Sequence, residues 1–472
     1  MNWLRVTALI VVPFFQAGPD APKTGGAYYA SPTGSPRGDG SITRPWDLAT
    51  ALTGAGTVQP GDTIWLRGGT YRGSFRSTVA GRAGAPVVIR QFRGERAVID
   101  GASSKKDTWY VGGEYSVFWG FELTNSNPQR STLSSTEEVR PDVVVNYAAH
   151  TKFINLIVHD GGVAFYTDAR YPDVEITGCI VYNNGWQEPG HGHGHGLYIK
   201  NYTGPLVARD NVVFNQYGYG IHAYTNASTG KLINITIEGN VSFNNGVLAA
   251  RALSPNILLG GAGYAAGGTI RDNLTYYSPA LSGSGRGGGA ANVLVGFKDL
   301  RNGDVVVEGN YLVGGSPVLQ FGYWAAARVS NLTLIGAGYG AGPLILKRDP
   351  SSHGQIWRDN IEQFSPPAKT KVVVRPSQYE PGRAHVVVYN WGKDKSVSVD
   401  TRGVLADGDR YEVRNVQDLF GPPVASGTVS GSSIAIPMRG VPAPIPIGLA
   451  TSPAPQTGPE FDAFVVTRIT TP

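Results

Sequence analysis

Histidines gather in the middle of the chain, at spacings that suit proton transfer or metal binding. Five of the eight histidines lie between His159 and His222. Imidazole is the side chain that most readily gains and loses a proton near neutral pH, so the cluster indicates chemistry in this region. His191, His193 and His195 alternate with glycine, and an extended chain places them on one side. Three such imidazoles can bind zinc or copper; the alternatives are a catalytic or substrate-contacting His195 and a loop without function.

A second group of reactive side chains alternates with apolar residues in three similar segments, 162–168, 196–201 and 220–225. Successive side chains of a strand point to opposite faces, so the apolar positions face inward and the polar ones outward. If the three segments lie side by side, one outward patch contains Tyr166, Asp168, Tyr198, Lys200, His222 and Tyr224. A patch that spans three strands is about 10 Å wide, which suits one or two sugar units.

Loop residues beside these segments extend the same patch. Flat aromatic rings stack on sugar rings, and arginine pairs with carboxylates. Arg251 follows the next copy of the segment and is placed to reach the patch. The other residues that we expect to contact a substrate are Trp186, Glu188, His193, Tyr219 and Tyr264.

The strands that position these residues belong to a sequence repeat. A recurring residue, asparagine in most copies, marks it at positions 155, 179, 211, 240, 273, 310, 331 and 360, with Gly120 one copy earlier. The intervals range from 21 to 37 residues, which is typical of a β-solenoid with loops inserted at its turns. Asparagine tolerates the left-handed backbone of a tight bend, and stacked asparagines satisfy buried polar groups. Cys179 takes one of these positions, so we expect a buried structural thiol.

The two ends of the chain differ from the repeat. Residues 1–20 have a basic start, a short apolar centre and a small-residue exit; this is typical of a signal peptide and predicts a secreted, periplasmic or extracellular protein. Residues 368–472 contain alternating runs separated by Gly/Asp turns, which predict a small antiparallel β-sandwich. Its Pro-rich tail, 442–458, is expected to wrap back along the protein.

Composition limits the possible partners. The chain has 64 glycines, 16% charged residues and a formal net charge of +5. That charge is compatible with an acidic partner, but no run of Lys and Arg indicates nucleic acid. After the signal peptide no apolar stretch is long enough to span a membrane. We therefore expect no nucleic-acid partner and no integral membrane segment, and we also expect a monomer.

Three motifs near the start carry a family resemblance. They are the entry segment 28–34, a cap helix at 47–54 and the segment 60–71. With the repeat, they make residues 25–365 resemble the pectate-lyase-like superfamily of right-handed parallel β-helix proteins. The resemblance implies an all-β fold of about nine or more coils with an N-terminal cap helix. A helix covers the open end of the first coil because uncovered strand edges and core would otherwise be exposed.

The same resemblance implies an activity. It favours a carbohydrate-active enzyme, a polysaccharide lyase that cleaves an acidic, uronate-containing polysaccharide by β-elimination. Lyases on this scaffold typically use Lys or Arg as the base, often with calcium, and alginate-modifying relatives use His and Tyr. By this resemblance the base is His222 or Lys200, the acid is Tyr224 or Tyr198, and the substrate carboxylate is neutralised by Arg251 or Lys200. The sequence lacks the acidic cluster of the calcium-dependent members, so no cofactor is assigned; calcium is compatible with the resemblance and zinc is less favoured.

Three alternatives stay open. A glycoside hydrolase on the same scaffold needs two carboxylates that face each other across the scissile bond, and the candidates near the patch are Asp168, Asp173 and Glu188. A uronan C5-epimerase would use the same residues as a lyase. A non-catalytic, glycan-binding β-helix needs no such local cluster of reactive side chains.

Overall fold

The computed structural model describes residues 25–102, 105–134, 137–226, 230–250, 253–281, 290–337, 343–349, 354–448 and 454–469. The predicted signal peptide, residues 1–20, and Arg251 lie outside these ranges. No helix in the described ranges combines the length and the apolar character that crossing a membrane requires.

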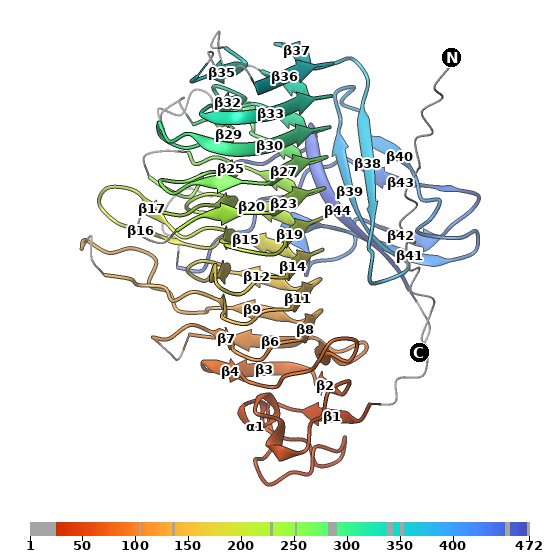
Figure 1. Cartoon of the computed structure of the whole chain (residues 1–472). Helices are drawn as coiled ribbons and strands as arrows, with labels where there is room; N and C mark the ends of the chain where they lie inside the picture. The colour runs from red at the N-terminus through yellow and green to blue at the C-terminus, as the bar shows by residue number, and fades with distance from the viewer. Residues whose placement is uncertain are drawn as a thin grey trace, which may run out of the picture.

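Most of the chain is a right-handed parallel β-helix, as the sequence predicted (Figure 1). Each coil contributes one strand to each of three parallel sheets, which we call sheets A, B and C. Sheet A has twelve strands: β1 (Ala27–Ala30), β2 (Thr63–Leu66), β5 (Val87–Gln91), β8 (Ser116–Trp119), β11 (Thr151–Ile154), β14 (Val174–Thr177), β19 (Leu206–Arg209), β23 (Ile235–Glu238), β27 (Gly268–Arg271), β30 (Asn302–Glu308), β33 (Trp324–Ser330) and β36 (Gly354–Arg358).

Sheets B and C complete the coils. Sheet B contains β3 (Gly69–Arg72), β6 (Ala97–Asp100), β9 (Glu122–Thr124), β12 (Ile157–His159), β15 (Ile180–Tyr182), β20 (Val212–Phe214), β24 (Val241–Phe243), β28 (Leu274–Tyr276), β31 (Tyr311–Val313), β34 (Thr333–Ile335) and β37 (Ile361–Gln363). Sheet C contains β4 (Phe75–Ser77), β7 (Trp109–Val111), β10 (Val144–Asn146), β13 (Phe165–Thr167), β18 (Leu197–Ile199), β21 (Ile221–Ala223), β25 (Ile257–Leu259), β29 (Val293–Val295), β32 (Leu319–Phe321) and β35 (Ile345–Lys347).

The turn between sheets A and B contains the amide ladder that the repeat predicted. The side-chain amide of Asn211 donates to the Oδ1 of Asn240 at 2.9 Å, and Asn240 donates to Asn273 at 3.0 Å. Below them the backbone N–H of Cys179 donates to the Oδ1 of Asn211. Each rung satisfies polar groups that no water reaches.

Three positions of the predicted repeat, Gly120, Asn155 and Asn331, are one residue out of register, and the φ value of Gly120 is +80°. Asn155 and Asn331 have φ values of +51° and +56° and occupy the left-handed turn position, which Gly178 fills in the next coil. The rung itself is the following residue, and Leu332 takes it where the sequence suggested Asn331: its N–H donates to the Oδ1 of Asn360 at 3.0 Å. Asparagine suits both positions, so its identity alone did not distinguish them.

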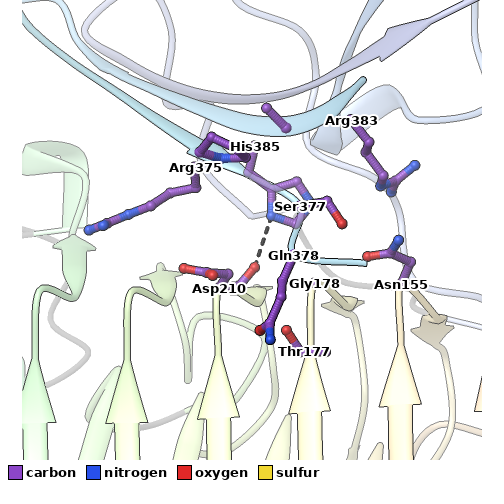
Figure 2. A pocket seen from close by; sticks show the side chains of 11 residues that line it. Asn155, Thr177, Gly178, Asp210, Arg375, Ser377, Gln378, Arg383 and His385 are labelled. Atoms are coloured by element: carbon purple, nitrogen blue, oxygen red, sulfur yellow. Dashed lines mark hydrogen bonds between the residues drawn. The ribbon is translucent and has the colours of Figure 1, made fainter. Parts of the chain in front are cut away.

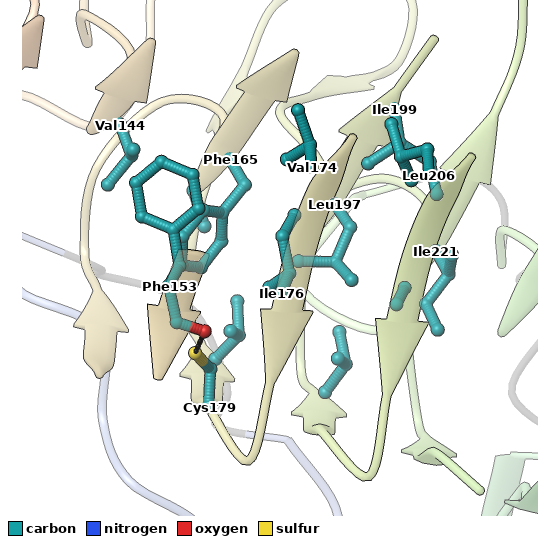
Figure 3. Close-up of a cluster of buried hydrophobic side chains, with 14 of the residues drawn as sticks. Val144, Phe153, Phe165, Val174, Ile176, Cys179, Leu197, Ile199, Leu206 and Ile221 are labelled. Carbon is teal, nitrogen blue, oxygen red and sulfur yellow. Dashed lines mark hydrogen bonds between the residues drawn. The ribbon is translucent and has the colours of Figure 1, made fainter. Parts of the chain in front are cut away.

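Inward side chains of the three sheets fill the interior of the β-helix. Figure 3 shows Cys179 beside Phe153 within this apolar core. The Cys179 thiol contacts the Phe153 carbonyl oxygen at 3.6 Å and is fully buried. Burial raises the pKa of this thiol to about 12, so it stays protonated and structural, as expected.

A short helix covers the first coil. It is α1 (Leu48–Leu52), and the Asp47 side chain caps it by accepting the N–H of Thr50. Leu48, Ala51 and Leu52 face the core. The helix lies within the range predicted for the cap and is followed by a 3-10 turn, η1 (Gly54–Gly56).

The C-terminal part forms antiparallel sheets that pack along the β-helix (Figure 1). The strand order in the larger sheet is β38 (Lys371–Pro376), β39 (Arg383–Tyr389), β44 (Phe461–Arg468), β41 (Arg410–Asn415) and β42 (Ala425–Thr428). The smaller sheet pairs β40 (Ser396–Asp400) with β43 (Ser433–Pro437), and an apolar cluster lies between the two sheets. The proposed boundary at residues 365–368 falls between β37 and β38.

The larger C-terminal sheet covers sheet B. Phe461 stacks on Tyr276 at 4.4 Å and meets Phe243 at 5.1 Å, so the outward aromatic residues of sheet B are buried. Figure 2 shows the same sheet over the turns between sheets A and B, where the His385 Nδ1–H donates to the carbonyl oxygen of Asp210 at 2.9 Å.

The described part of the Pro-rich tail runs back over the turns between sheets B and C. The backbone N–H of Ile447 donates to the Asp160 carboxylate at 2.8 Å, and its carbonyl oxygen accepts from Arg130 at 2.9 Å. The carbonyl oxygen of Pro444 accepts from the Asn183 side chain at 3.0 Å. Sheet C, by contrast, has no described strand packed over the middle of its outer face.

Candidate active site on sheet C

The strand register brings together the outward side chains that the sequence aligned. Tyr166 on β13 pairs with Tyr198 on β18, and Tyr198 pairs with His222 on β21. The next two coils place Leu258 and Leu294 in the same column. The polar part of the column is therefore local to three coils, as the alignment predicted.

A second amide ladder holds the turns that enter these strands. The Asn256 side chain accepts from Asn245 at 2.7 Å and donates to Asn292 at 2.9 Å. One coil earlier, the backbone N–H of Asn184 donates to the Gln216 side chain. This ladder fixes the corner between sheets B and C, from which the histidine-rich loop leaves the coil.

His222 is buried among aromatic rings. Its imidazole stacks on Tyr219 at 4.2 Å and on Tyr224 at 4.8 Å, and the His195 ring meets it edge-on at 4.4 Å. Burial, with the nearby charges of His195 and Lys200, holds the pKa of His222 well below its ordinary value. The ring is thus neutral near pH 7, and its Nδ1 has no hydrogen-bond partner among the described residues.

Lys200 follows β18 and lies between two tyrosine rings. Its Nζ is 4.8 Å from the ring centre of Tyr166 and 4.4 Å from that of Tyr198, and it lies 3.5 Å from the Tyr166 hydroxyl. The residue is only 8% exposed. Burial lowers the pKa of Lys200, and the charge of Asp168 offsets this only in part. Lys200 therefore yields its proton more readily than a surface lysine does.

The two tyrosines beside Lys200 hold their protons. Burial raises the pKa of both Tyr166 and Tyr198 to about 12. A phenol of this kind donates a hydrogen bond or a proton, rather than carrying a charge at rest.

A hollow of about 350 Å³ opens in front of Tyr166 and Tyr198; Lys200 and His222 lie behind these rings and are not among its lining residues. His195 lines it, and the His195 Nδ1 accepts the backbone N–H of Tyr219 at 3.1 Å, so the ring proton is on Nε2. Burial lowers the pKa of His195 to about 3. The lining comprises Glu137, Glu138, Asp142, Val163, Tyr166, Trp186, Glu188, His193, Gly194, His195 and Tyr198.

Several carboxylates in and beside the hollow were missed from the sequence. Asp142 accepts the N–H of Val163 at 2.8 Å. Burial, with the nearby charges of Asp107 and Glu138, raises the pKa of Asp142 to about 7. These residues lie on loops before β7 and β10, outside the three segments with the alternating pattern. The only sequence indication was the closeness of Glu137, Glu138 and Asp142 along one loop.

The histidine-rich loop is a hairpin of β16 (Trp186–Gln187) and β17 (Gly192–His193). Two of its histidines turn toward a carboxylate: the Glu188 oxygens lie 2.9 Å from the Nδ1 of His191 and 3.1 Å from the Nε2 of His193. His195 lies after the hairpin and bonds to Tyr219 instead. The three imidazoles therefore do not share one carboxylate, because the chain leaves the hairpin at Gly194, where φ is +90°, although His193 and His195 both line the hollow.

Other predicted site residues are engaged elsewhere. Asp168 forms an ion pair with Arg170 at 2.8 Å, and Asp173 forms one with His150 at 2.7 Å. With Glu188 held by histidines, no two of the three carboxylates suggested for a hydrolase contact each other in the described residues. Tyr264 is 41% exposed on the turn after β25, and its hydroxyl lies beside Gly303 rather than the hollow.

One group of side chains has the composition of a metal site. The ligand atoms of Glu188, His191 and His193 lie within 4.8 Å of one another. Calcium takes six to eight oxygen ligands, so two imidazoles and one carboxylate do not suit it. This set of donors fits a divalent transition metal.

Comparison with known families agrees with the fold. Residues 118–252 match the family model described as "Right handed beta helix region". That stretch is a right-handed β-helix by sequence as well as by structure. It includes β11 to β24 and most of the candidate active site.

Two named relatives share parts of the sequence. Pectate lyase PEL9 of Emericella nidulans is 40% identical over 75 residues, which cover 16% of this chain and 18% of the relative. Pectate lyase L of Thermoclostridium stercorarium is 24% identical over 291 residues, covering 47% of this chain and 23% of the relative. The chain thus matches less than a quarter of the length of either relative.

Solved structures with similar folds are more distant in sequence. Pectate lyase Pel9A is 16% identical with a TM-score of 0.43, and the match covers 71% of this chain and 79% of that one. A rhamnogalacturonan lyase is also 16% identical, with a TM-score of 0.44 and coverage of 72% and 87%. The lacto-N-biosidase of Eubacterium ramulus is 13% identical, with a TM-score of 0.46 and coverage of 72% and 68%.

Proposed function

We propose that this protein is a carbohydrate-active enzyme that cleaves a uronate-containing polysaccharide by β-elimination on the outer face of sheet C. The main observation is the buried Lys200, whose amine lies 3.5 Å from the hydroxyl of Tyr166, and Tyr166 lines the open hollow. The two relatives named pectate lyases support the substrate class. The signal-like residues 1–20 favour action outside the cytoplasm.

In this mechanism Lys200 is the base. Its neutral amine takes the C5 proton of a uronate, because the lowered pKa increases the neutral fraction. The electrons of the C5–H bond form the C4–C5 double bond, and the C4–O bond breaks. The Tyr166 hydroxyl gives its proton to the departing oxygen.

The same two residues can return to their starting protonation states by exchanging one proton. After the reaction Lys200 is an ammonium and Tyr166 a phenolate, with their polar atoms 3.5 Å apart. The pKa of Tyr166 is about 12, whereas that of Lys200 is below 10.5. Transfer of the proton from the lysine back to the tyrosine is therefore downhill. Tyr198 borders the same amine, and the His195 Nε2–H is a further donor toward the hollow.

The test is to incubate the protein with polygalacturonate, rhamnogalacturonan and alginate while recording ultraviolet absorbance and reducing ends. β-Elimination creates a conjugated, absorbing product, so both readings should rise together on at least one polymer. New reducing ends without absorbance would contradict the lyase proposal. Isomerised uronate without cleavage, followed by nuclear magnetic resonance, would indicate a C5-epimerase instead. Binding with no reaction would leave only a glycan-binding role.

A glycoside hydrolase is a second candidate because of Asp142. A carboxyl group whose pKa is about 7 can hold a proton at neutral pH and act as an acid. Its neighbours Asp107 and Glu138 could supply the second carboxylate of a hydrolase. In that case Asp142→Asn would abolish formation of reducing ends, whereas Lys200→Ala would leave most of it.

A further inference from the structure

Within the described ranges, the hairpin of β16 and β17 holds a carboxylate whose ionic partners are both histidines. Glu188 is 7% exposed. One of its oxygens lies 2.9 Å from the Nδ1 of His191, and the other lies 3.1 Å from the Nε2 of His193. A buried carboxylate needs a compensating positive charge. A cation bound between the carboxylate and the two ring nitrogens would meet this need.

The backbone and side chains around Glu188 hold the three groups in position. The Gln187 side chain donates to the carbonyl oxygens of Glu188 at 2.6 Å and His191 at 3.0 Å, which fixes the turn. Trp186 stacks on the His193 ring at 4.9 Å with an interplanar angle of 12°. The ligand atoms are therefore close before any ion arrives, which lowers the entropic cost of binding.

We propose that Glu188, His191 and His193 bind a divalent transition metal ion of the zinc class. Two imidazole nitrogens and one carboxylate oxygen, all within 4.8 Å of one another, form a three-ligand set. Zinc sites with three protein ligands keep a fourth position for water or substrate. The nitrogen donors select such an ion over calcium or magnesium, which prefer oxygen.

The position that is left for a fourth metal ligand faces the hollow. Glu188 and His193 both line the hollow beside Tyr166 and Tyr198, so the fourth ligand would come from that side. Glu137, Glu138 and Asp142 make the hollow acidic, and an acidic hollow would repel a uronate unless a cation lay within it. The metal would then neutralise the substrate carboxylate; this last step rests on the proposed lyase function, whereas metal binding does not.

The binding experiment uses the whole protein without a polyhistidine tag, freed of metal by dialysis against a chelator. Titration calorimetry with Zn²⁺ should give one ion per chain, and Ca²⁺ should give no heat at this site. Co²⁺ should produce the visible absorption of a low-symmetry site and lose it when Zn²⁺ is added. His191→Ala and His193→Ala should each weaken Zn²⁺ binding by more than about tenfold, because each removes one of three ligands.

The matched control is His150→Ala. His150 also pairs with a carboxylate, Asp173 at 2.7 Å, but as a single, partly exposed imidazole, so Zn²⁺ binding should be unchanged. Glu188→Gln preserves the side-chain shape and should weaken binding as the histidine variants do. Equal Zn²⁺ binding by wild type and a His191→Ala/His193→Ala double variant would overturn the proposal, as would Ca²⁺ displacing Zn²⁺.

The two proposals fail separately. Tight Zn²⁺ binding that depends on these residues, without any lyase product, would retain the metal site and reject the proposed function. Lyase product from protein that binds no Zn²⁺ would retain the function and reject the metal site.

Discussion

Two buried histidines occupy similar surroundings on different faces of the β-helix. His159 is on β12 of sheet B and stacks on Tyr182 with ring centres 4.7 Å apart. His222 is on β21 of sheet C and stacks on Tyr219 at 4.2 Å. Their exposures are 8% and 7%, so burial alone does not distinguish them.

The surroundings of the two histidines shift their pKa values in opposite directions. Burial would lower the pKa of His159, but hydrogen bonds to Asp160 at 2.8 Å and Glu122 at 3.0 Å outweigh it and raise the pKa to about 9. His222 faces Lys200 rather than a carboxylate, and its pKa is well below the ordinary value. The imidazolium on sheet B stabilises the fold beside the C-terminal sheets. The neutral imidazole on sheet C has a buried Nδ1 without a hydrogen-bond partner among the described residues.

The largest expected effect is a loss of activity at sheet C without a loss of stability. Lys200→Ala should lower kcat on the best polymer by about 10²- to 10⁴-fold, the usual contribution of a general base. Urea unfolding should change little. Lys347→Ala is the matched control: Lys347 is also on sheet C and lies over the Trp357 ring at 3.8 Å, far along the helix. Equal activity of the two variants would contradict the role of Lys200.

The second expected effect is a loss of stability at sheet B, which the C-terminal sheet covers. Phe461→Ala removes a fully buried ring that packs on Phe243, Tyr276 and Tyr389, and should cost about 3–5 kcal/mol in urea unfolding. Phe364→Ala, at a ring that is 59% exposed, should cost less than about 0.5 kcal/mol. Activity per folded molecule should be retained in both, since sheet C is untouched. A loss of kcat in folded Phe461→Ala would show that the two faces are coupled.

A third test uses pH. The folded pKa of His159, about 9, exceeds the ordinary 6.5, so its stabilisation is complete below pH 6.5 and is lost as pH rises through 9. This shift is worth about 3 kcal/mol. The difference in unfolding free energy between wild type and His159→Gln should therefore shrink between pH 6.5 and 9. A constant difference would mean that His159 is not a buried cation.

The smallest expected effect concerns the tyrosine beside Lys200. Tyr166→Phe removes the proton donor but keeps the ring, and Tyr198 remains nearby. We expect kcat to fall by about tenfold with KM little changed, which is less than the usual contribution of a general acid because Tyr198 can replace part of it. Tyr110→Phe, two coils away under Arg76, should leave kcat unchanged. A change in KM alone would make Tyr166 a binding residue rather than the acid.

Much of sheet C could be predicted from the sequence because strand periodicity is local. Alternation separated inward Leu197 and Ile199 from outward Tyr198 and Lys200, and the register across β18 and β21 agrees with that alignment. The amide ladder was also predicted, although Gly120, Asn155 and Asn331 were assigned to the wrong position within the turn.

The acidic side of the site could not be predicted in the same way. Asp107, Glu138 and Asp142 come from loops of irregular length, and only the stacking of coils brings them together. The partners of Asp168 and Glu188 depend on side-chain geometry within turns, which residue type and period do not determine. Arg251 lies outside the described residues, so its role in the site stays a prediction.

The contact of the tail at Ile447 affects the order in which the coils unfold. Stacked coils usually fray from an end, because each coil holds only its neighbours. Here Ile447 bonds to Asp160 across 287 residues of chain, and its carbonyl oxygen is bound by Arg130. These two hydrogen bonds connect the chain beyond the last coil to the coils in the middle of the stack. The coils between these two points must therefore unfold together, or unfold only after these hydrogen bonds break. Hydrogen exchange in the later coils should then be more uniform than in a solenoid whose end is not attached.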